Sequence, residues 1–326
     1  PLIADSSPAE PRLFAAIAMT RSQRASPVPT DSGVFLYDSV NERWRRFGPT
    51  IQQVNSMSTD PSNPENIFLA CGNGIVRSQD NGKTWRLVTG WRESDIVKIA
   101  IDPSNGQNIY AASAWGVTIS RDGGDNWSAA NEGLVEKFSK SIIVDRLDPK
   151  RLLLATTAGL FVSHDNAKTW KQIPSAPKIA ILGLARNKAD PNIWIAGTEG
   201  NGVILSSDNG KTWKPTAPEL SKANIYGITT DPFNSQTLAV GGWETGIWIS
   251  TDGGASWASR GDGLPSQNVT ATTFDYAKSG RLWVSTFEEG TFYSDDNGAT
   301  WRSDDRVVPG AVGSILGAYV NDLGFI

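Results

Sequence analysis

The segment SSDNGKTW at Ser206–Trp213 decides the fold, because the chain repeats it at a nearly constant interval. Five further copies follow the pattern Ser-x-Asp-x-Gly-x-x-Trp, one of them with alanine in place of glycine: SQDNGKTW (78–85), SRDGGDNW (120–127), SHDNAKTW (163–170), STDGGASW (250–257) and SDDNGATW (294–301). Their aspartates are 42 to 44 residues apart, and a degenerate copy, YDSVNERW, lies one interval earlier at Tyr37–Trp44. A period of this length is typical of a propeller or a solenoid, so we expect seven structural units.

Each repeat also contains four short runs of strand-forming residues. In the second repeat these are VNSMSTDP, NIFLACG, GIVRSQD and KTWRLV, and none of the runs has helical spacing. In every repeat the third run begins with a glycine. We expect the turn between the first and second runs at Asp60-Pro61, Asp102-Pro103, Asp148-Pro149, Asp190-Pro191 and Asp231-Pro232, with Asp275 in the next repeat. We therefore predict an all-β protein with almost no helix, a seven-bladed propeller whose blades are four-stranded antiparallel sheets.

The two ends of the chain indicate how the ring closes. RLFAAIA, GVFLYD and RWRRF near the N-terminus correspond to second, third and fourth strands. The segment Val312–Asp322 near the C-terminus looks like a first strand, with Asp322 at the turn position. We expect this segment to complete the first blade, so that residues 1–326 form a single propeller domain. In an alternative arrangement the segment PLIAD at residues 1–5 is the first strand, and the C-terminal strand is left over.

The repeated pattern resembles the Asp-box, or BNR repeat, of sialidases, sortilin-type receptors, xyloglucanases and the photosystem II stability and assembly factor family. In such a hairpin the aspartate can cap backbone N–H groups, glycine or asparagine can adopt a positive φ, and the tryptophan can pack between blades. Ala167 replaces the glycine of one copy, so we expect that box to be slightly altered. Because the boxes lie in different blades, their carboxylates cannot converge on one substrate, and we expect neither a metal site nor a cofactor.

Composition excludes several classes of function. Thirty basic and 34 acidic residues give a net charge of -4, which argues against a nucleic-acid partner or an anionic membrane surface. No apolar run reaches the roughly 18 residues of a membrane-spanning helix. Cys71 is the only cysteine and His164 the only histidine, which excludes an intrachain disulfide and a His-pair zinc motif. We expect Cys71 to be a buried apolar residue and His164 to lie in an exposed turn.

The meander topology sorts the loops onto two faces. The first turns and the Asp-boxes share one, the box face, whereas the second-to-third turns and the inter-blade connections share the other, which we call the variable face. Binding residues tend to lie on variable loops of a rigid scaffold, and aromatic rings with carboxylates suit a sugar or a peptide. The ligand-binding residues expected there are Trp91, Arg92, Trp115, Glu199, Trp243, Glu244, Glu288 and Glu289. A long loop from Thr20 to Ser32, with Arg21 and Arg24, belongs to the same face.

Four candidate functions compete. A sialidase is disfavoured by the missing Arg-Ile-Pro motif and by that family's six blades, and a sortilin-type receptor by the missing cysteine-rich modules. Resemblance to the photosystem assembly factors, which fits the length and the blade count, implies a non-catalytic scaffold. We therefore expect a monomer that holds a protein, peptide or glycan on its variable face and lies in the cell envelope, the periplasm or outside the cell. The alternative is a glycoside hydrolase-like or carbohydrate-binding propeller with Glu244 and Glu288 as general acid and base, although xyloglucanases pair two propellers around a cleft.

Overall fold

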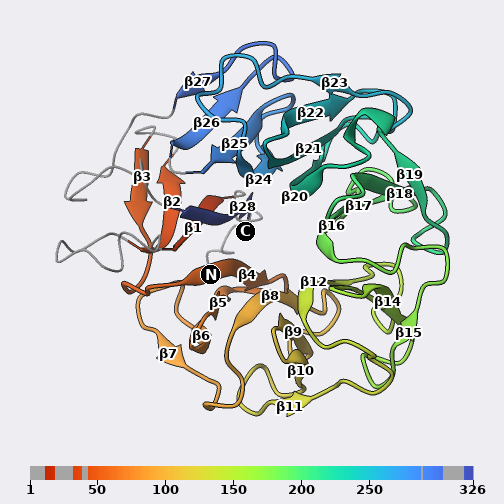
Figure 1. Ribbon diagram of the computed structural model, residues 1–326. Helices are drawn as coiled ribbons and strands as arrows, with labels where there is room; N and C mark the ends of the chain where they lie inside the picture. Colours follow the sequence, from red (N-terminus) through yellow and green to blue (C-terminus); the bar gives the residue numbers. More distant parts are fainter. Residues whose placement is uncertain (1–11, 19–31, 39–42, 288, 304–318, 326) are drawn as a thin grey trace, which may run out of the picture.

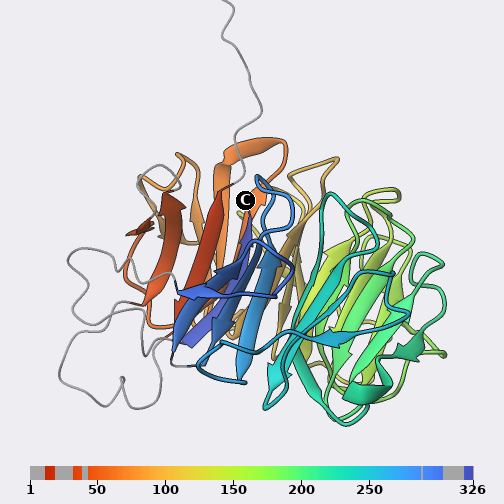
Figure 2. The ribbon, with the colours of Figure 1, turned by 90° about the horizontal axis from the view of Figure 1, so that it is seen from above.

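The computed structural model describes residues 12–18, 32–38, 43–287, 289–303 and 319–325. Seven antiparallel sheets of four strands each stand around a common axis (Figure 1). Seen from the edge, the strands run between the two faces of a disc (Figure 2). The predicted seven-bladed, all-β propeller is confirmed, and the described residues contain one helix, the short 3-10 helix η1 (Pro218–Leu220).

The blades are numbered from the N-terminus, and each is given from its innermost to its outermost strand. Blade 1 comprises β28 (Tyr319–Phe325), β1 (Leu13–Ala18), β2 (Gly33–Asp38) and β3 (Arg43–Arg46). Blade 2 comprises β4 (Val54–Asp60), β5 (Asn63–Cys71), β6 (Gly74–Ser78) and β7 (Arg86–Leu87). Blade 3 comprises β8 (Ile96–Ile101), β9 (Ile109–Ser113), β10 (Gly116–Ser120) and β11 (Ser128–Ala129). Blade 4 comprises β12 (Ser139–Val144), β13 (Leu152–Thr156), β14 (Gly159–Ser163) and β15 (Lys171–Gln172).

The remaining blades have the same order. Blade 5 comprises β16 (Ile181–Arg186), β17 (Trp194–Thr198), β18 (Val203–Ser206) and β19 (Lys214–Thr216). Blade 6 comprises β20 (Asn224–Thr230), β21 (Leu238–Trp243), β22 (Gly246–Ser250) and β23 (Ala258–Ser259). Blade 7 comprises β24 (Val269–Phe274), β25 (Leu282–Thr286), β26 (Gly290–Ser294) and β27 (Arg302–Ser303).

The C-terminal strand closes the ring, as predicted. β28 pairs with β1 and also contacts β4 and β24, the innermost strands of the neighbouring blades. The expected segment, Val312–Asp322, is corrected by the ladder: Leu13 lies opposite Phe325, so the strand must extend to that residue. Asp322 lies opposite Ala16 within the ladder and not at a turn. Residues 304–318 and the alternative first strand at residues 1–5 lie outside the described part of the chain.

Apolar side chains fill each of the seven interfaces between blades. Successive residues of a strand point to opposite sides of a sheet, so one strand supplies two interfaces. In β13, Leu152 and Leu154 pack toward blade 3, whereas Leu153 packs toward blade 5. The clusters continue around the ring to Leu13 of blade 1 and Trp283 of blade 7. Burial on both sides explains why the middle strands are almost continuously apolar.

A buried Asx turn joins the first and second strands of blades 2 to 7. In each turn a side-chain Oδ1 accepts the N–H of the residue two positions on, at 2.8–2.9 Å, and the acceptors are Asp60, Asp102, Asp145, Asn187, Asp231 and Asp275. In blades 4 and 5 the Asx turn is capped by Asp145 and Asn187, and the predicted turn residues Asp148 and Asp190 lie three residues later in the same connection between the first and second strands. They form a second bend, in which Arg151 N–H donates to the Asp148 carbonyl (2.8 Å) and Ile193 N–H to the Asp190 carbonyl (3.1 Å).

Each complete Asp-box closes through hydrogen bonds within its own hairpin. Asp208 accepts from Ser206 Oγ (2.7 Å) and from Thr212 N–H (2.8 Å) at Oδ1, and from Thr212 Oγ1 (2.6 Å) at Oδ2. Burial raises the pKa of Asp208, but the hydrogen bonds from Thr212 and Ser206 outweigh it and lower the pKa to about 2. The ionised carboxylate therefore has its donors within the hairpin, which supports a structural role for these aspartates.

The box with alanine keeps the same geometry. Ala167 has a φ of +63°, and its N–H donates to Ser163 Oγ at 2.9 Å, as Gly210 N–H does to Ser206 Oγ. The backbone hydrogen bond is therefore kept, but the indole differs: Trp170 Nε1–H donates to the Ala130 carbonyl, whereas Trp213 Nε1–H donates to the carbonyl of Gly210 in its own box. The methyl group is fully buried in the same cluster as Trp170, so packing and hydrogen bonds hold a backbone conformation that alanine disfavours.

The box tryptophans pack against the preceding blade, as predicted. Trp85 meets Phe47 edge to face, with ring centroids 5.7 Å apart. The Nε1–H of Trp170 donates to the Ala130 carbonyl at 2.9 Å, and a partner some 40 residues earlier belongs to the blade before. In four other boxes the indole N–H donates to the glycine carbonyl of its own hairpin, as Trp85 does to Gly82 (2.9 Å), so in those boxes the packing of the ring joins the two blades.

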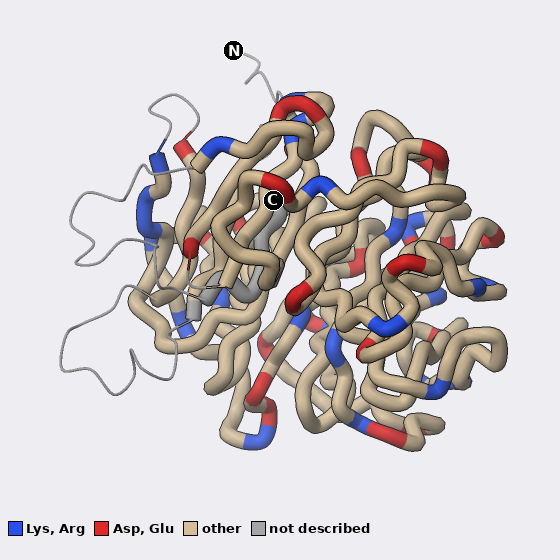
Figure 3. The backbone as a smooth tube through the Cα atoms, turned by 45° about the horizontal axis from the view of Figure 1, so that its top comes forward, with Lys and Arg blue, Asp and Glu red and all other residues tan. Residues whose placement is uncertain are grey.

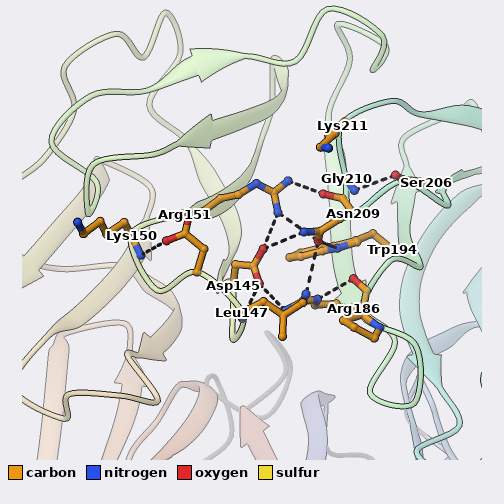
Figure 4. A network of polar contacts seen from close by, with 12 residues as sticks. Asp145, Leu147, Lys150, Arg151, Arg186, Trp194, Ser206, Asn209, Gly210 and Lys211 are labelled. Carbon is orange, nitrogen blue, oxygen red and sulfur yellow. Dashed lines mark hydrogen bonds and ion pairs between the residues drawn. The ribbon is translucent and has the colours of Figure 1, made fainter.

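Blades 4 and 5 are also joined by a buried polar network (Figure 4). Asp145 pairs with Arg151 at 2.8 Å and with Arg186 at 2.7 Å. Asn209, from the next Asp-box, donates to Asp145 Oδ2 (3.3 Å) and accepts the Trp194 Nε1–H (2.9 Å). Both guanidinium groups lie over the Trp194 ring, at 5.8 and 5.2 Å from its centroid. This network connects the first turn of blade 4 to the box of blade 5.

Candidate functional site

The variable face carries three exposed tryptophans. The exposed fractions are 84% for Trp91, 62% for Trp115 and 41% for Trp243. All three lie in second-to-third turns, at strand ends or in inter-blade connections, as the sequence indicated. The two single residues considered in the sequence lie where they were expected. His164 is exposed in a turn on the box face. Cys71 is fully buried in β5, and burial raises the pKa of its thiol to about 12.

One of these tryptophans is fixed by a carboxylate. The Nε1–H of Trp115 lies 3.2 Å from Asp95 Oδ2 and 3.3 Å from Ser94 Oγ. Asp95 ends the connection from β7 to β8 and has a left-handed backbone, with φ +51°. Its N–H donates to the Gly72 carbonyl (2.8 Å), and its carbonyl accepts the N–H of Ala114 (3.2 Å). The polar edge of the indole is therefore satisfied, while most of its apolar surface is open to a ligand.

A second aromatic group lies between blades 6 and 7. Trp243 meets Phe287 edge to face, with centroids 5.3 Å apart and planes at 66°. The next residue, Glu244, is exposed and has φ +55°, and its N–H donates to Asn268 Oδ1 at 2.8 Å. A left-handed conformation is uncommon for glutamate, and such strain is frequent at ligand sites. This group thus also combines an exposed indole with a carboxylate on a constrained backbone.

The remaining predicted residues lie elsewhere on the face. The Arg92 guanidinium lies 5.0 Å from the centroid of the Trp91 ring. Glu199 is exposed at the end of β17. Burial lowers the pKa of Lys140 in blade 4, and the negative charge of Glu199 opposes that decrease. Glu289 is exposed in blade 7, whereas Glu288 and the loop residues Arg21 and Arg24 lie outside the described residues.

The predicted residues do not form one cluster. Trp91, Arg92 and Trp115 belong to the connection into blade 3 and to blade 3 itself, whereas Trp243 and Glu244 belong to blade 6. Figure 1 shows β9 and β10 on the opposite side of the ring from β21 and β22. Two separate aromatic groups therefore lie on opposite sides of the ring.

Two contributors were not anticipated from the sequence. Phe287 occupies the same second-to-third turn in blade 7 as Trp115 and Trp243 do in theirs, so a comparison of these turns for aromatic residues would have found it. Asp95 lies in a connection whose sequence is not repeated, and only its hydrogen bond to Trp115 reveals its role.

The mouth leads toward a cavity among the innermost strands. This cavity has a volume of about 180 Å³, and its lining includes Asn55, Lys98, Lys140, Tyr226 and Thr270. Among the described residues no three His, Cys, Asp or Glu side chains are grouped so that they could hold a metal ion. No helix in that part of the chain is long and apolar enough to span a membrane. Figure 3 shows basic and acidic residues interspersed along the loops.

Comparison with known proteins gives partial matches. The family model described as Sortilin, neurotensin receptor 3 matches residues 201–310. An oligoxyloglucan-reducing end-specific xyloglucanase from Emericella nidulans is 29% identical over 134 residues, which is 35% of this chain and 16% of the relative. The match thus spans about a sixth of the length of that curated relative.

Solved structures show the same fold. A GH74 enzyme from Niastella koreensis superposes with a TM-score of 0.73 at 18% identity, over 89% of this chain and 54% of the other. YCF48 from Cyanidioschyzon merolae superposes with a TM-score of 0.62 at 15% identity, over 80% and 87% of the two chains.

These findings correct one expectation about function. The interpretation as a non-catalytic scaffold was wrong, because the similarity in sequence is to a xyloglucanase and the superposition on a GH74 enzyme covers more of this chain than the superposition on YCF48. The length argument failed because one propeller can match part of a longer enzyme. The repeat, the seven blades and these matches together show that the chain is a seven-bladed Asp-box propeller, similar both to xyloglucan-degrading enzymes and to YCF48.

Proposed function

We propose that the chain is a carbohydrate-active propeller of the glycoside hydrolase type, and that its variable face binds a hydroxyl-rich polysaccharide such as xyloglucan. One observation carries the proposal: on two sides of the mouth, an exposed indole lies beside a carboxylate whose backbone is held in a left-handed conformation. Similarity to the Emericella nidulans xyloglucanase supports this substrate class.

The chemistry of the two groups suits a glycan. The flat apolar face of an indole packs against the C–H face of a pyranose ring, and a carboxylate accepts hydrogen bonds from its hydroxyl groups. Because Trp115 and Trp243 lie on blades 3 and 6, the ligand would be an extended chain that crosses the mouth and contacts both. A polysaccharide is too large to cross a membrane unaided, so we place the protein outside the cytoplasm.

Hydrolysis requires a second carboxyl group beside the first. Glycoside hydrolases use one carboxyl group as general acid and another as base or nucleophile. Glu244 is exposed next to Trp243 and is the proposed member of this pair on blade 6. Its proposed partner is Glu288, which the sequence repeat aligns with this position in the next blade and which lies outside the described residues.

The test has a binding arm and a catalytic arm. Wild-type protein should bind xyloglucan and release reducing ends from it, and Glu244→Gln should abolish release while retaining binding. The double variant Trp115→Ala, Trp243→Ala should lose binding about 30-fold or more, because a buried interface aromatic is commonly worth about 2 kcal/mol. Both indoles are exposed in the free protein, so its melting temperature should change by only a few degrees.

The outcomes separate the parts of the proposal. Binding without release of reducing ends would contradict the hydrolase assignment and leave glycan binding in place. If wild-type protein neither binds nor cleaves a panel of β-linked polysaccharides, the whole proposal is wrong.

A further inference from the structure

A groove with a mixed polar and apolar lining lies beside Trp115, outside the residues predicted from the sequence. Its volume is about 430 Å³, within the usual range of small-molecule pockets. It is lined by the connection from β3 to β4 (residues 50–53), by Gly72 and Asn73 in the second-to-third turn of blade 2, and by Asp95. The groove therefore lies on the variable face, where blade 2 meets its two neighbours.

The walls of the groove are held by hydrogen bonds between backbone groups. Gly72 N–H donates to the Gln53 carbonyl (3.2 Å), and Asp95 N–H donates to the Gly72 carbonyl (2.8 Å). Gln53 is engaged with Asn55 Oδ1 at 3.2 Å. By contrast, the side chains of Gln52 and Asn73 are exposed at the rim. The backbone is thus arranged before a ligand arrives, and the open groups are two amides and one carboxylate oxygen.

The lining has the composition of a site for an uncharged, hydroxyl-rich ligand. Its polar side chains are Thr50, Gln52, Gln53, Asn73 and Asp95, which include one negative and no positive charge. Amides both donate and accept hydrogen bonds, and a carboxylate accepts two, so the set matches vicinal hydroxyl groups. The single carboxylate would repel an acidic sugar. Because Asp95 Oδ2 also accepts from Trp115, a sugar bound to Oδ1 would lie close to the exposed indole.

We propose that this groove is a subsite for a neutral sugar residue of the glycan, recognised by Asp95, Asn73 and Gln52 with Trp115 beside it. The inference rests on the proposed function and adds two things: a specificity for neutral over acidic sugars, and a set of hydrogen-bonding side chains that hold one sugar residue beside Trp115.

Calorimetric titration with two oligosaccharides of equal length tests this inference. One probe is a neutral xyloglucan heptasaccharide and the other is an oligogalacturonide. The double variant Gln52→Ala, Asn73→Ala should bind the neutral probe about tenfold more weakly, since it loses two or more hydrogen bonds. Gln107→Ala removes a matched exposed amide from the opposite face and should bind like wild type.

The isosteric variant Asp95→Asn isolates the role of charge. It keeps an acceptor for the Trp115 indole, so the fold of the turn should survive, and melting temperature checks this. Affinity for the neutral probe should fall about tenfold, because a charge-assisted hydrogen bond is replaced by a neutral one, whereas affinity for the oligogalacturonide should not fall.

Three results would overturn the inference. Groove variants that bind the neutral probe within twofold of wild type, while Trp243→Ala weakens it, would refute the subsite and leave the proposed function standing. Stronger binding of the oligogalacturonide by wild type would refute the neutral specificity. Failure of wild type to bind either probe would refute the subsite, and failure with the polysaccharides as well would refute the proposed function.

Discussion

The buried carboxylate of Asp145 offers the sharpest test of what holds the ring together. Its side chain is 1% exposed, and those of its partners Arg151 and Arg186 are each 8% exposed. Asp145→Asn removes the charge and turns Oδ2, which accepts from Arg151 and Asn209, into an NH2 donor, while the remaining oxygen can still accept the Leu147 N–H. The equivalent turn of the next blade shows that this works, since Asn187 Oδ1 accepts the N–H of Ala189 at 2.9 Å.

The magnitude follows from the two guanidinium groups that lose their counterion. Removal of one partner from a buried ion pair typically costs about 3–5 kcal/mol. We expect the lower part of that range, about 3 kcal/mol, because the amide keeps one acceptor. At about 2.1 cal/mol/K per residue, unfolding of a 326-residue chain has an entropy of about 0.7 kcal/mol/K. The melting temperature should therefore fall by about 4–5 °C.

The matched control is Asp102→Asn. Asp102 occupies the same turn position in blade 3 and is also buried, but its hydrogen bonds come from Ser104 and Asn108, and no ion pair of Asp102 occurs within the described residues. Its loss of charge should cost about 1 kcal/mol or less. Differential scanning calorimetry of the two variants beside wild type makes the comparison. Equal shifts for both variants, or a shift below about 1 °C for Asp145→Asn, would refute the reasoning.

The pH dependence adds an independent check. Burial raises the pKa of Asp145, but the Leu147 N–H, Arg151 and Arg186 outweigh it, and the net pKa is lowered. A lowered carboxyl pKa contributes stability that is fully present above the unfolded value of about 3.9 and is lost as the pH falls through the folded pKa. The difference between wild type and Asp145→Asn should therefore be constant above about pH 5 and should shrink below about pH 4.

Three further predictions concern the scaffold. Ala167→Gly relieves left-handed backbone strain but loses a buried methyl group, so the melting temperature should change by less than about 2 °C. The control Ala155→Gly in β13 loses a buried methyl group without relieving strain and should lower the free energy of unfolding by about 1–2 kcal/mol. Equal losses of stability in the two variants would contradict strain at Ala167. Asp208→Ala should lower the free energy of unfolding by about 1 kcal/mol at neutral pH, and this loss should become smaller as the pH falls from about 4 to about 2. The loss should be the same in the presence of calcium or of a chelator. A melting temperature that depends on calcium would show that the box binds metal. Deletion from Tyr319 onward exposes the edge of β1 and should cause aggregation in light scattering, so a soluble monomer would refute the closure argument.

The fold could be predicted because each repeat contains the same Asp-box, the same turn residues and the same short strand-forming runs. The interval between the box aspartates sets the number of blades, and turn residues mark the strand ends. The Asp-Pro pairs of blades 4 and 5 lie in the predicted first turns but do not supply the capping side chains. Asp145 and Asn187 do, and the interval from Asp102 points to both. The C-terminal strand was misplaced because pairing with Leu13, and not a motif, sets its end.

The candidate site could be predicted only in part. The exposure of Trp115 and Trp243 follows from their positions in a turn and at the end of a strand, since a tryptophan in the middle of a blade such as Trp194 is fully buried. Their separation across the ring depends on blade order, which the sequence contains but a search for aromatic residues ignores. The contact between Trp115 and Asp95 depends on the path of an inter-blade connection whose sequence is not repeated. Packing between unlike loops decides such contacts, and no local pattern encodes it.

The distribution of backbone strain separates the scaffold from the site. On the box face, left-handed positions are occupied mostly by glycine or by asparagine such as Asn209, which tolerate that region. Beside the two exposed indoles the left-handed residues are Asp95 and Glu244, where a glycine would be less strained by about 1 kcal/mol or more. A side chain that only filled space would not explain an acid at both positions. The strain is consistent with a requirement for a carboxylate at each indole, which is what the proposed glycan site needs.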